Sequence, residues 1–132
     1  MAEDRYAFVA GVLVRWGWLL DLMLRRPRRR VVRVFGERGA ASVLDACCGS
    51  GTLSAYLAGR GMAVTGIDAS PSMLALARTR APGVAFTKAD LTRLETEAAF
   101  DGAVIGFALH EMPDPLRQRV WAGMKRAVKP GG

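Results

Sequence analysis

The sequence predicts an α/β domain with a parallel, doubly wound sheet, and two stretches carry that prediction. Residues 43–46 form a short, mostly apolar run, a turn with Gly49 and Gly51 follows, and residues 52–60 carry apolar side chains at helical spacing. Residues 61–80 repeat this order of strand, turn and helix. Successive units of this kind are typical of a parallel sheet with helices on its faces.

The turn at Gly49 and Gly51 is the first candidate ligand site. Glycine lets the backbone turn sharply and approach a ligand closely, and the N–H groups at the start of the next helix face a polar or anionic group. A dinucleotide fingerprint would place glycine or alanine where this chain has Ser54. Asp45 precedes the turn on the strand, and it disfavours a pyrophosphate and favours a ligand with ammonium and sulfonium charges.

The second unit ends its strand in an acid, Asp68, which lies 17 residues beyond Gly51. A carboxylate at this position can accept hydrogen bonds from both hydroxyls of a ribose. Ser70 and Pro71 then predict a helix, with serine as the N-cap and proline at the first helical position.

Two further units follow. Residues 83–91 alternate apolar and other residues and end in Asp90. Residues 103–109 form a near-continuous apolar run, which predicts a strand buried on both faces. Asp114 and Pro115 predict the N-cap and first turn of a helix over residues 116–128.

His110 and Glu111 come at the end of that fourth strand. An imidazole titrates near neutral pH, so His110 is a candidate base, although it could instead pack over a cofactor or cap the strand. Because adjacent strand residues point to opposite faces, His110 and Glu111 are not expected to work as a pair.

The stretch Asp-Ala-Cys-Cys-Gly-Ser-Gly at residues 45–51 resembles motif I of the class I S-adenosylmethionine-dependent methyltransferases, and residues 65–73 resemble their motif II. The resemblance covers residues 43–132. It implies a Rossmann-like sheet of order 3-2-1-4, S-adenosylmethionine as cofactor, and methyl transfer to a small-molecule acceptor. Residues 108–113 look most like the quinone-biosynthesis branch, which implies a quinone-like or lipid-like acceptor.

The resemblance also implies roles for individual residues. Asp68 would hold the ribose, and Asp90 with Leu91 would contact the adenine, unless Asp90 only caps the turn that follows it. His110 is the catalytic candidate, and no metal site is expected. The cofactor-binding candidates are Asp45, Cys47, Gly49, Ser50, Gly51, Asp68, Ala69, Met73, Asp90, Leu91 and Phe107. Two alternatives stay open: an NAD- or NADP-dependent oxidoreductase, and a cofactor-binding domain without turnover.

Composition fits one globular domain. The chain has 132 residues, of which 51% are hydrophobic. Its two cysteines, Cys47 and Cys48, are adjacent and give neither a disulfide framework nor the spacing of metal ligands, which indicates a reducing cytoplasm.

Residues 1–42 form an N-terminal helical segment that carries much of the positive charge. They hold nine arginines and four acids, and six of the arginines fall between Arg25 and Arg33. Residues 7–24 are strongly apolar and include Trp16 and Trp18. The favoured interpretation is a helix packed on the domain, followed by a solvated arginine loop.

Two other interpretations of the 7–33 segment remain. One is an interfacial helix with a polybasic tail, which would make the protein membrane-peripheral. The other is a spanning helix, which Arg15 and Asp21 disfavour. No aromatic residue is interleaved with the arginine run, so nucleic acid is not an expected partner.

Residues 129–132 resemble the turn that precedes a fifth strand in the family. We therefore expect 43–132 to be a cofactor-binding unit truncated before that strand. The fourth strand would then be an exposed, apolar edge that invites self-association.

Overall fold

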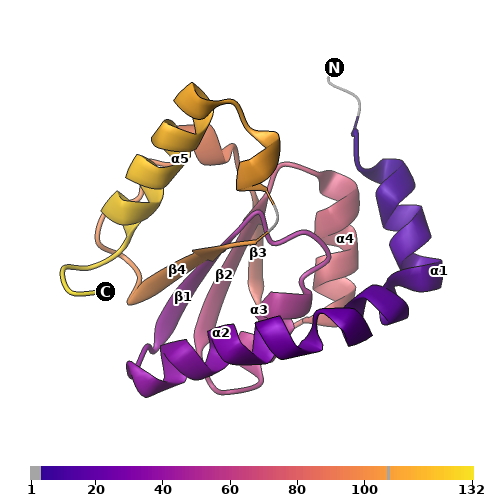
Figure 1. The fold of residues 1–132 in the computed structure, drawn as a ribbon, viewed down its shortest axis with the longest axis horizontal. Coiled ribbons are helices and arrows are strands. Elements are labelled where there is room, and N and C mark those ends of the chain that lie inside the picture. The colour runs from indigo at the N-terminus through magenta and orange to yellow at the C-terminus, as the bar shows by residue number, and fades with distance from the viewer. Residues whose placement is uncertain (1–3, 107) are drawn as a thin grey trace.

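The computed structural model describes residues 4–106 and 108–132. Its four strands, β1 (Ser42–Ala46), β2 (Ala63–Asp68), β3 (Ala85–Lys88) and β4 (Gly102–Ile105), form one sheet in the order β3-β2-β1-β4 (Figure 1). All three pairings are parallel, and Val43 of β1 lies opposite Val64 on one side and Gly102 on the other. This confirms the predicted fold class and strand order.

Helices cover both faces of the sheet (Figure 1). Helices α3 (Thr52–Ala58) and α4 (Pro71–Arg80) lie on one face, and α5 (Asp114–Ala127) lies on the other. The side chains of β1 alternate between two buried clusters, as a strand requires. Val43 packs with α3 and α4, whereas Leu44 packs with α5 and the short 3₁₀ helix η1 (Leu91–Arg93).

Two helices precede the sheet, α1 (Ala7–Met23) and α2 (Arg25–Glu37). The arginine run therefore lies in a helix, and the prediction of a solvated loop is wrong. Arginine is a good helix former, and Pro27 lies in the first turn, where its missing N–H has no helical partner to lose. Val32 and Phe35 then bury one side of α2 against the cluster that contains α3.

Strand β4 is shorter than predicted. We expected it over residues 103–109, but it ends at Ile105, which lies opposite Ala46, the last residue of β1. The next residue of the neighbouring strand, Cys47, has a φ of 54° and leaves the sheet, so β4 has no partner on that side beyond Ile105. Residues 109–111 instead form a 3₁₀ helix, η2 (Leu109–Glu111).

Helix α5 also begins differently from the prediction. The N-cap is Pro113, and Asp114 is already the first helical residue. Its carboxylate pairs with Arg117 one turn later, so it does not cap the helix as expected. By contrast, Ser70 caps α4 as predicted, because its hydroxyl accepts a hydrogen bond from the N–H of Met73 at 3.2 Å.

Among the described residues, no single helix is long and apolar enough to cross a membrane. Helices α1 and α2 meet the length and composition criteria only as a pair, which is bent by 66°.

Candidate functional site

The predicted polar residues meet at one edge of the sheet. Asp45 lies near the end of β1, Asp68 ends β2, Asp90 follows β3, and His110 follows β4. Because the strands are parallel, their carboxyl ends meet at the same edge, which is where α/β folds of this type bind ligands.

The turn after β1 depends on its glycines. Gly49 and Gly51 have φ of 54° and 77°, in the region that favours glycine. A Cβ on Gly51 would lie 2.8 Å from the Cβ of Ala77, so glycine at this position lets the turn pack against α4. A Cβ on Gly49 would meet only Met73 Cε at 3.7 Å, which places that methionine side chain beside the turn.

Asp68 connects this turn to the start of α4. Its Oδ2 accepts a hydrogen bond from the N–H of Gly49 at 2.9 Å, and its Oδ1 accepts one from the N–H of Ser70 at 2.9 Å. Ala69, which lies between Asp68 and Ser70 in the chain, is exposed. The half-buried carboxylate therefore lies between the two motifs that sequence analysis singled out.

Asp45 is buried and faces inward. The Ser54 hydroxyl, on α3, donates a hydrogen bond of 2.6 Å to its Oδ2. The pKa of Asp45 is raised to about 6, mainly by burial and also by the nearby charge of Asp68, while the hydrogen bond from Ser54 opposes the shift. In this geometry Asp45 holds α3 and the turn in place.

Asp90 caps the turn that follows it. Its Oδ1 accepts hydrogen bonds from the N–H and the hydroxyl of Thr92, at 2.9 and 2.7 Å, and these bonds lower the pKa of Asp90. The side chain of Leu91 is buried in the cluster beneath α5. Both residues lie at the predicted edge, and Phe107 lies outside the described residues.

His110 and Glu111 do approach each other, contrary to the prediction. They lie in η2 and not on a strand, and His110 Nε2 is 3.8 Å from Glu111 Oε1. In a 3₁₀ turn, neighbouring side chains do not alternate between opposite faces as they do in a strand. Both side chains are exposed.

Sequence reasoning missed the N-terminal contribution to this edge. Asp4 accepts hydrogen bonds from the Ser70 hydroxyl at 2.7 Å and the Ser72 N–H at 2.9 Å. Hydrogen bonding from Ser72, and then from Ser70, holds the pKa of Asp4 well below its usual range. The Tyr6 hydroxyl donates to Glu111 Oε2 at 3.4 Å. Residues 4–6 thus connect the start of α4 with η2, and no local sequence pattern indicates contacts over such separations.

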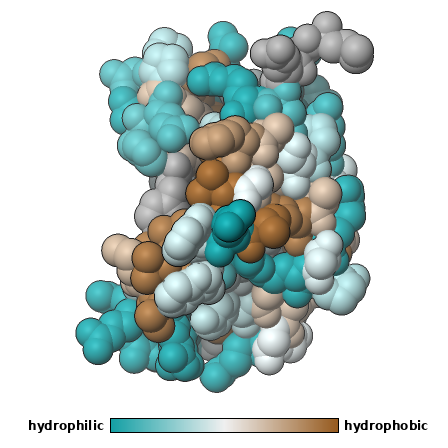
Figure 2. Space-filling view, turned by 90° about the vertical axis from the view of Figure 1, so that its right-hand side faces the viewer, coloured by the Kyte–Doolittle hydropathy of each residue, from teal (hydrophilic) through white to brown (hydrophobic). Residues whose placement is uncertain are grey.

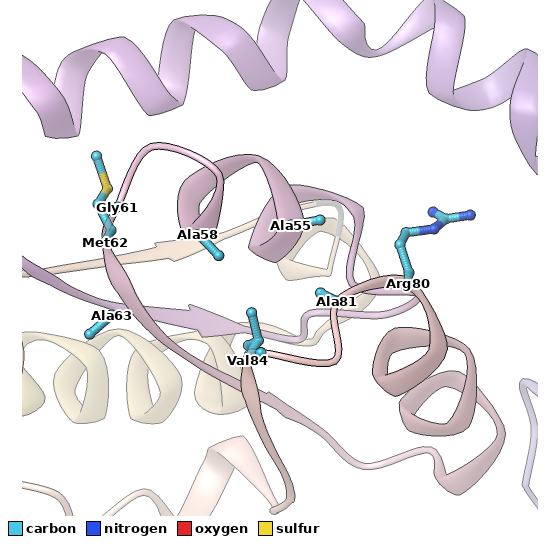
Figure 3. Close-up of a pocket in the computed structure, with 9 residues that line it drawn as sticks. Ala55, Ala58, Gly61, Met62, Ala63, Arg80, Ala81 and Val84 are labelled. Atoms are coloured by element: carbon cyan, nitrogen blue, oxygen red, sulfur yellow. The ribbon is translucent and has the colours of Figure 1, made fainter.

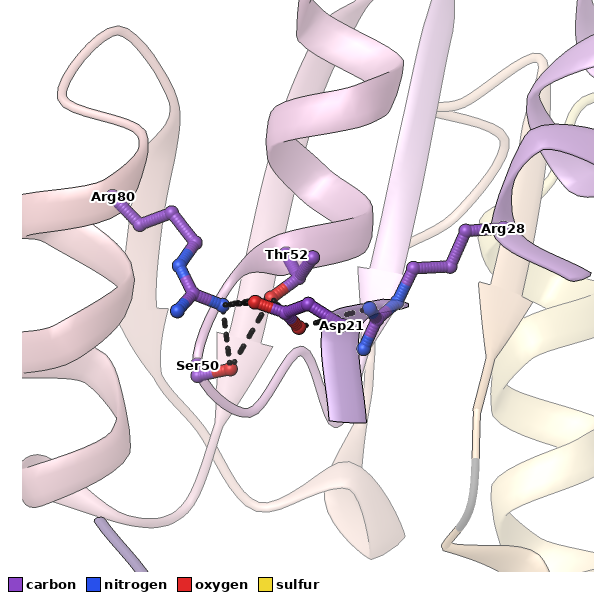
Figure 4. A network of polar contacts seen from close by, with 5 residues as sticks. All are labelled: Asp21, Arg28, Ser50, Thr52 and Arg80. Atoms are coloured by element: carbon purple, nitrogen blue, oxygen red, sulfur yellow. Dashed lines mark hydrogen bonds and ion pairs between the residues drawn. The ribbon is translucent and has the colours of Figure 1, made fainter. Parts of the chain in front are cut away.

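A second missed feature is an ionic network around Asp21 of α1 (Figure 4). Its Oδ1 pairs with Arg28 at 2.9 Å, and its Oδ2 pairs with Arg80 at 3.3 Å. The Thr52 hydroxyl donates to Asp21 Oδ1 at 3.3 Å, and Arg80 donates to the Ser50 hydroxyl at 3.3 Å. The network therefore connects both N-terminal helices to the glycine turn.

The two cysteines are held as thiols. The pKa of Cys47 is raised to about 12, mainly by burial and also by the charges of Asp68 and Asp45. Burial likewise raises the pKa of Cys48. Because the thiolate is the nucleophilic form, neither side chain is suited to covalent catalysis at neutral pH.

Among the hollows in the described part of the chain, two lie beside these elements. The larger, of about 450 Å³, lies between α3 and α4 at the amino ends of β2 and β3, beside Ala63 and Val84 (Figure 3). It is therefore at the opposite end of the strands from Asp68. The smaller, of about 290 Å³, lies between η2 and α5 and is lined in part by Leu109 and Trp121.

Comparison with known proteins places this geometry in context. The family model described as "Methyltransferase domain" matches residues 43–132. An uncharacterized methyltransferase of Synechocystis is 40% identical over 91 residues, which cover 68% of this chain and 43% of that protein. The demethylmenaquinone methyltransferase of Renibacterium salmoninarum is 37% identical over 109 residues, covering 82% of this chain and 45% of that protein. The chain thus spans less than half the length of these curated relatives.

Solved structures of methyltransferases are also similar to this chain. An amino pentose methyltransferase from Micromonospora echinaspora with bound S-adenosylmethionine is 32% identical, with a TM-score of 0.74 over 81% of this chain and 47% of that one. The magnesium protoporphyrin IX methyltransferase of Synechocystis, also with bound S-adenosylmethionine, is 25% identical, with a TM-score of 0.70 over 78% of this chain and 53% of that one.

Proposed function

This chain belongs to the methyltransferase domain family, and from that premise we propose that it binds S-adenosylmethionine and transfers the methyl group to a small-molecule acceptor. The observation that carries the proposal is the position of Asp68. Its carboxylate lies at the end of β2, hydrogen bonded to the glycine turn and to the start of α4. A carboxylate at this place is suited to hold the hydroxyls of a ribose.

The remaining donors and acceptors at this edge fit the rest of the cofactor. Asp90, which also caps the turn at Thr92, would accept a hydrogen bond from the adenine amine, and Met73, whose Cε lies beside Gly49, would pack against the ring. The turn over residues 47–51 would enclose the methionine part, with Cys47, Ser50 and Ala69 at its borders. The carboxylates of Asp68 and Asp90 suit hydroxyl and amine donors, and together with the buried carboxylate of Asp45 they make this edge unfavourable for a pyrophosphate, which argues against the NAD or NADP alternative.

Methyl transfer requires mainly that the acceptor be aligned with the methyl group of the cofactor. A sulfonium methyl group is already activated, so the protein has to place the acceptor in line with it and remove a proton from the acceptor. We propose His110 as the base that accepts this proton. Its Nε2 lies 3.8 Å from Oε1 of Glu111, and both residues are in η2. A neutral imidazole can act as a general base toward an acceptor hydroxyl.

For the acceptor we propose a quinone-like ring. The hollow between η2 and α5 lies next to His110 in the chain and presents Leu109 and the indole of Trp121, which suits a flat apolar molecule. The demethylmenaquinone methyltransferases among the relatives support this class.

Isothermal titration calorimetry with S-adenosylhomocysteine and with NADH tests the cofactor. We expect binding of the first and none of the second, and the reverse result would overturn the proposal. Transfer of a labelled methyl group to a naphthoquinol and to an amino sugar then tests the acceptor. Preference for the amino sugar would reject the quinone-like class, and cofactor binding with no transfer to either would favour a domain without turnover.

A further inference from the structure

Helix α1 is apolar on the side that faces solvent. Its inner side is buried at Ala10 and Gly17, which face the domain. A surface helix of a soluble protein normally carries polar residues on its outer side. Here the outer side chains are large and hydrophobic, with exposed fractions of 81% for Phe8, 63% for Trp18 and 71% for Met23.

Figure 2 shows this face, with hydrophobic side chains gathered across its middle and hydrophilic ones around them. The exposed hydrophobic residues of α1 are Phe8, Val9, Val12, Val14, Trp16, Trp18, Leu19, Leu20, Leu22 and Met23. A concentration of exposed hydrophobic side chains of this kind marks a surface that binds a partner or a membrane.

Helix α2 supplies positive charge directly beside it, because only Leu24 separates the two helices. Arg25, Arg26, Arg29 and Arg30 are exposed, and within the described residues none of the four lies within ion-pair distance of a carboxylate. An apolar helix with tryptophans next to a cluster of arginines has the two features that bind an anionic bilayer: apolar side chains for the acyl boundary and cations for the headgroups.

The helix is also fixed on the domain. Asp21 is held by Arg28 and Arg80, and Arg15 is exposed within the apolar side. Inserting α1 across a bilayer would break the ion pairs of Asp21 and bury the charge of Arg15. A helix that lies in the interface keeps those ion pairs and leaves Arg15 in contact with water. We infer that α1 and α2 (the α1–α2 surface) bind the face of an anionic membrane with α1 parallel to it, independently of which acceptor the protein methylates.

Co-sedimentation of the whole chain with vesicles tests this. Vesicles of phosphatidylcholine mixed with phosphatidylglycerol should bind it, and phosphatidylcholine alone should bind it at least tenfold less. Because each basic residue at an anionic surface contributes roughly a fivefold factor, the triple variant R26Q/R29Q/R30Q should bind about a hundredfold more weakly. The matched control R60Q/R119Q/K125Q removes the same charge from exposed positions on the rest of the molecule and should lower binding by less than about fivefold.

The contribution of the hydrophobic side chains of α1 to membrane binding is tested by replacing a tryptophan. Trp18→Ala should weaken vesicle binding several-fold, whereas Trp121→Ala, on α5 and 56% exposed, should not. Equal binding to neutral vesicles, or equal loss in both triple variants, would overturn the inference. Absence of vesicle binding together with light scattering that Trp18→Ala abolishes would also overturn it, and would assign the α1–α2 surface to a second copy of the chain.

Discussion

The hydroxyl of Ser54 donates a 2.6 Å hydrogen bond to the carboxylate of Asp45, and both side chains are buried. Ser54 occupies the position where a dinucleotide fingerprint has its third glycine, which allows close helix–strand packing. Here the helix is instead held to β1 by a polar contact. The hydrogen bond to the buried Asp45 therefore explains why this chain has Ser54 at a position where a dinucleotide-binding site has glycine or alanine.

This buried carboxylate should give stability an unusual pH dependence. Burial raises the pKa of Asp45 from 3.8 to about 6, so between these values the folded state binds a proton more readily than the unfolded state. The contribution of Asp45 to the free energy of unfolding therefore falls as pH rises through that window, by roughly 2–3 kcal/mol. Asp45→Asn should remove this fall, and urea unfolding between pH 4 and pH 7 measures it.

Asp101→Asn is the control, because the contribution of Asp101 to stability changes with pH in the opposite direction to that of Asp45. Hydrogen bonds from the N–H groups of Ala41 and Ser42 lower the pKa of Asp101 to about 2, so its contribution is present at neutral pH and is lost as pH falls through the folded pKa. That variant should be less stable than the parent at pH 7. If Asp45→Asn were also less stable at pH 7, the hydrogen bond from Ser54 would stabilise the carboxylate by more than burial destabilises it.

The sheet and its edge site could be predicted because their signals are local. Alternating apolar runs, the glycines of the turn, and the cap at Ser70 each lie within a few residues, and each appears in the structure where expected. The length of β4 could not be predicted from its own apolar run. It is set by its neighbour, because β1 leaves the sheet at Cys47 and removes the pairing partner.

The contacts of Asp4 and Asp21 were beyond prediction for a different reason. Asp4 reaches Ser72, and Asp21 reaches Arg80, across about half the length of the chain, and side-chain contacts between residues so far apart leave no periodic pattern. The arginine helix was missed because a high density of like charges is also typical of a solvated loop. Arginine favours a helix when a few apolar side chains, here Val32 and Phe35, fix one side of it.

Removing the carboxylate of Asp68 should weaken cofactor binding. Asp68→Ala loses charged acceptors for the ribose and also releases the N–H of Gly49, so we expect S-adenosylhomocysteine affinity to fall by roughly 1.5–3 kcal/mol. Calorimetry measures it, with a thermal melt to show that the variant is folded. Glu97→Ala, an exposed acid in the loop before β4, is the control and should bind as the parent does. Unchanged affinity in Asp68→Ala would remove the ribose assignment.

Gly51 and Gly61 form a natural comparison. Both have positive φ, 77° and 85°, but a Cβ on Gly51 would lie 2.9 Å from Ala77 Cα, whereas one on Gly61 would meet nothing within 4 Å. Gly61→Ala should therefore cost only the backbone term of roughly 1–2 kcal/mol. Gly51→Ala should cost more, by about 1–3 kcal/mol, since α3 and α4 must also move apart. Equal unfolding free energies for the two variants would show that the turn yields without strain.

Strand β4 should make the chain associate with itself. In the described sheet it pairs with β1 on one side only, and an edge strand with apolar side chains offers unpaired N–H and C=O groups to another chain. We expect light scattering to show association at micromolar concentration, with slower hydrogen exchange over residues 102–105 as it increases. Trp18→Ala separates this from association through α1, because it should leave the β4 effect intact. A stable monomer would show that the edge is protected.

Asp21 should couple the N-terminal helices to the glycine turn. Asp21→Asn loses the ionic attraction to Arg28 and Arg80. Asp21 also accepts a hydrogen bond from the Thr52 hydroxyl, and Arg80 donates one to the Ser50 hydroxyl, so the network reaches the turn. We expect a loss of roughly 1–3 kcal/mol in stability because the network is partly buried.

Hydrogen exchange of Asp21→Asn should become faster in α1 and at residues 50–52 together, and S-adenosylhomocysteine affinity should fall several-fold. Glu37→Gln is the matched control, because its pair with Arg33 is exposed and 3.8 Å long, so it should change stability by less than about 0.5 kcal/mol. Faster exchange confined to α1, with the turn and the affinity unchanged, would show that the network holds the helix without influencing the cofactor site.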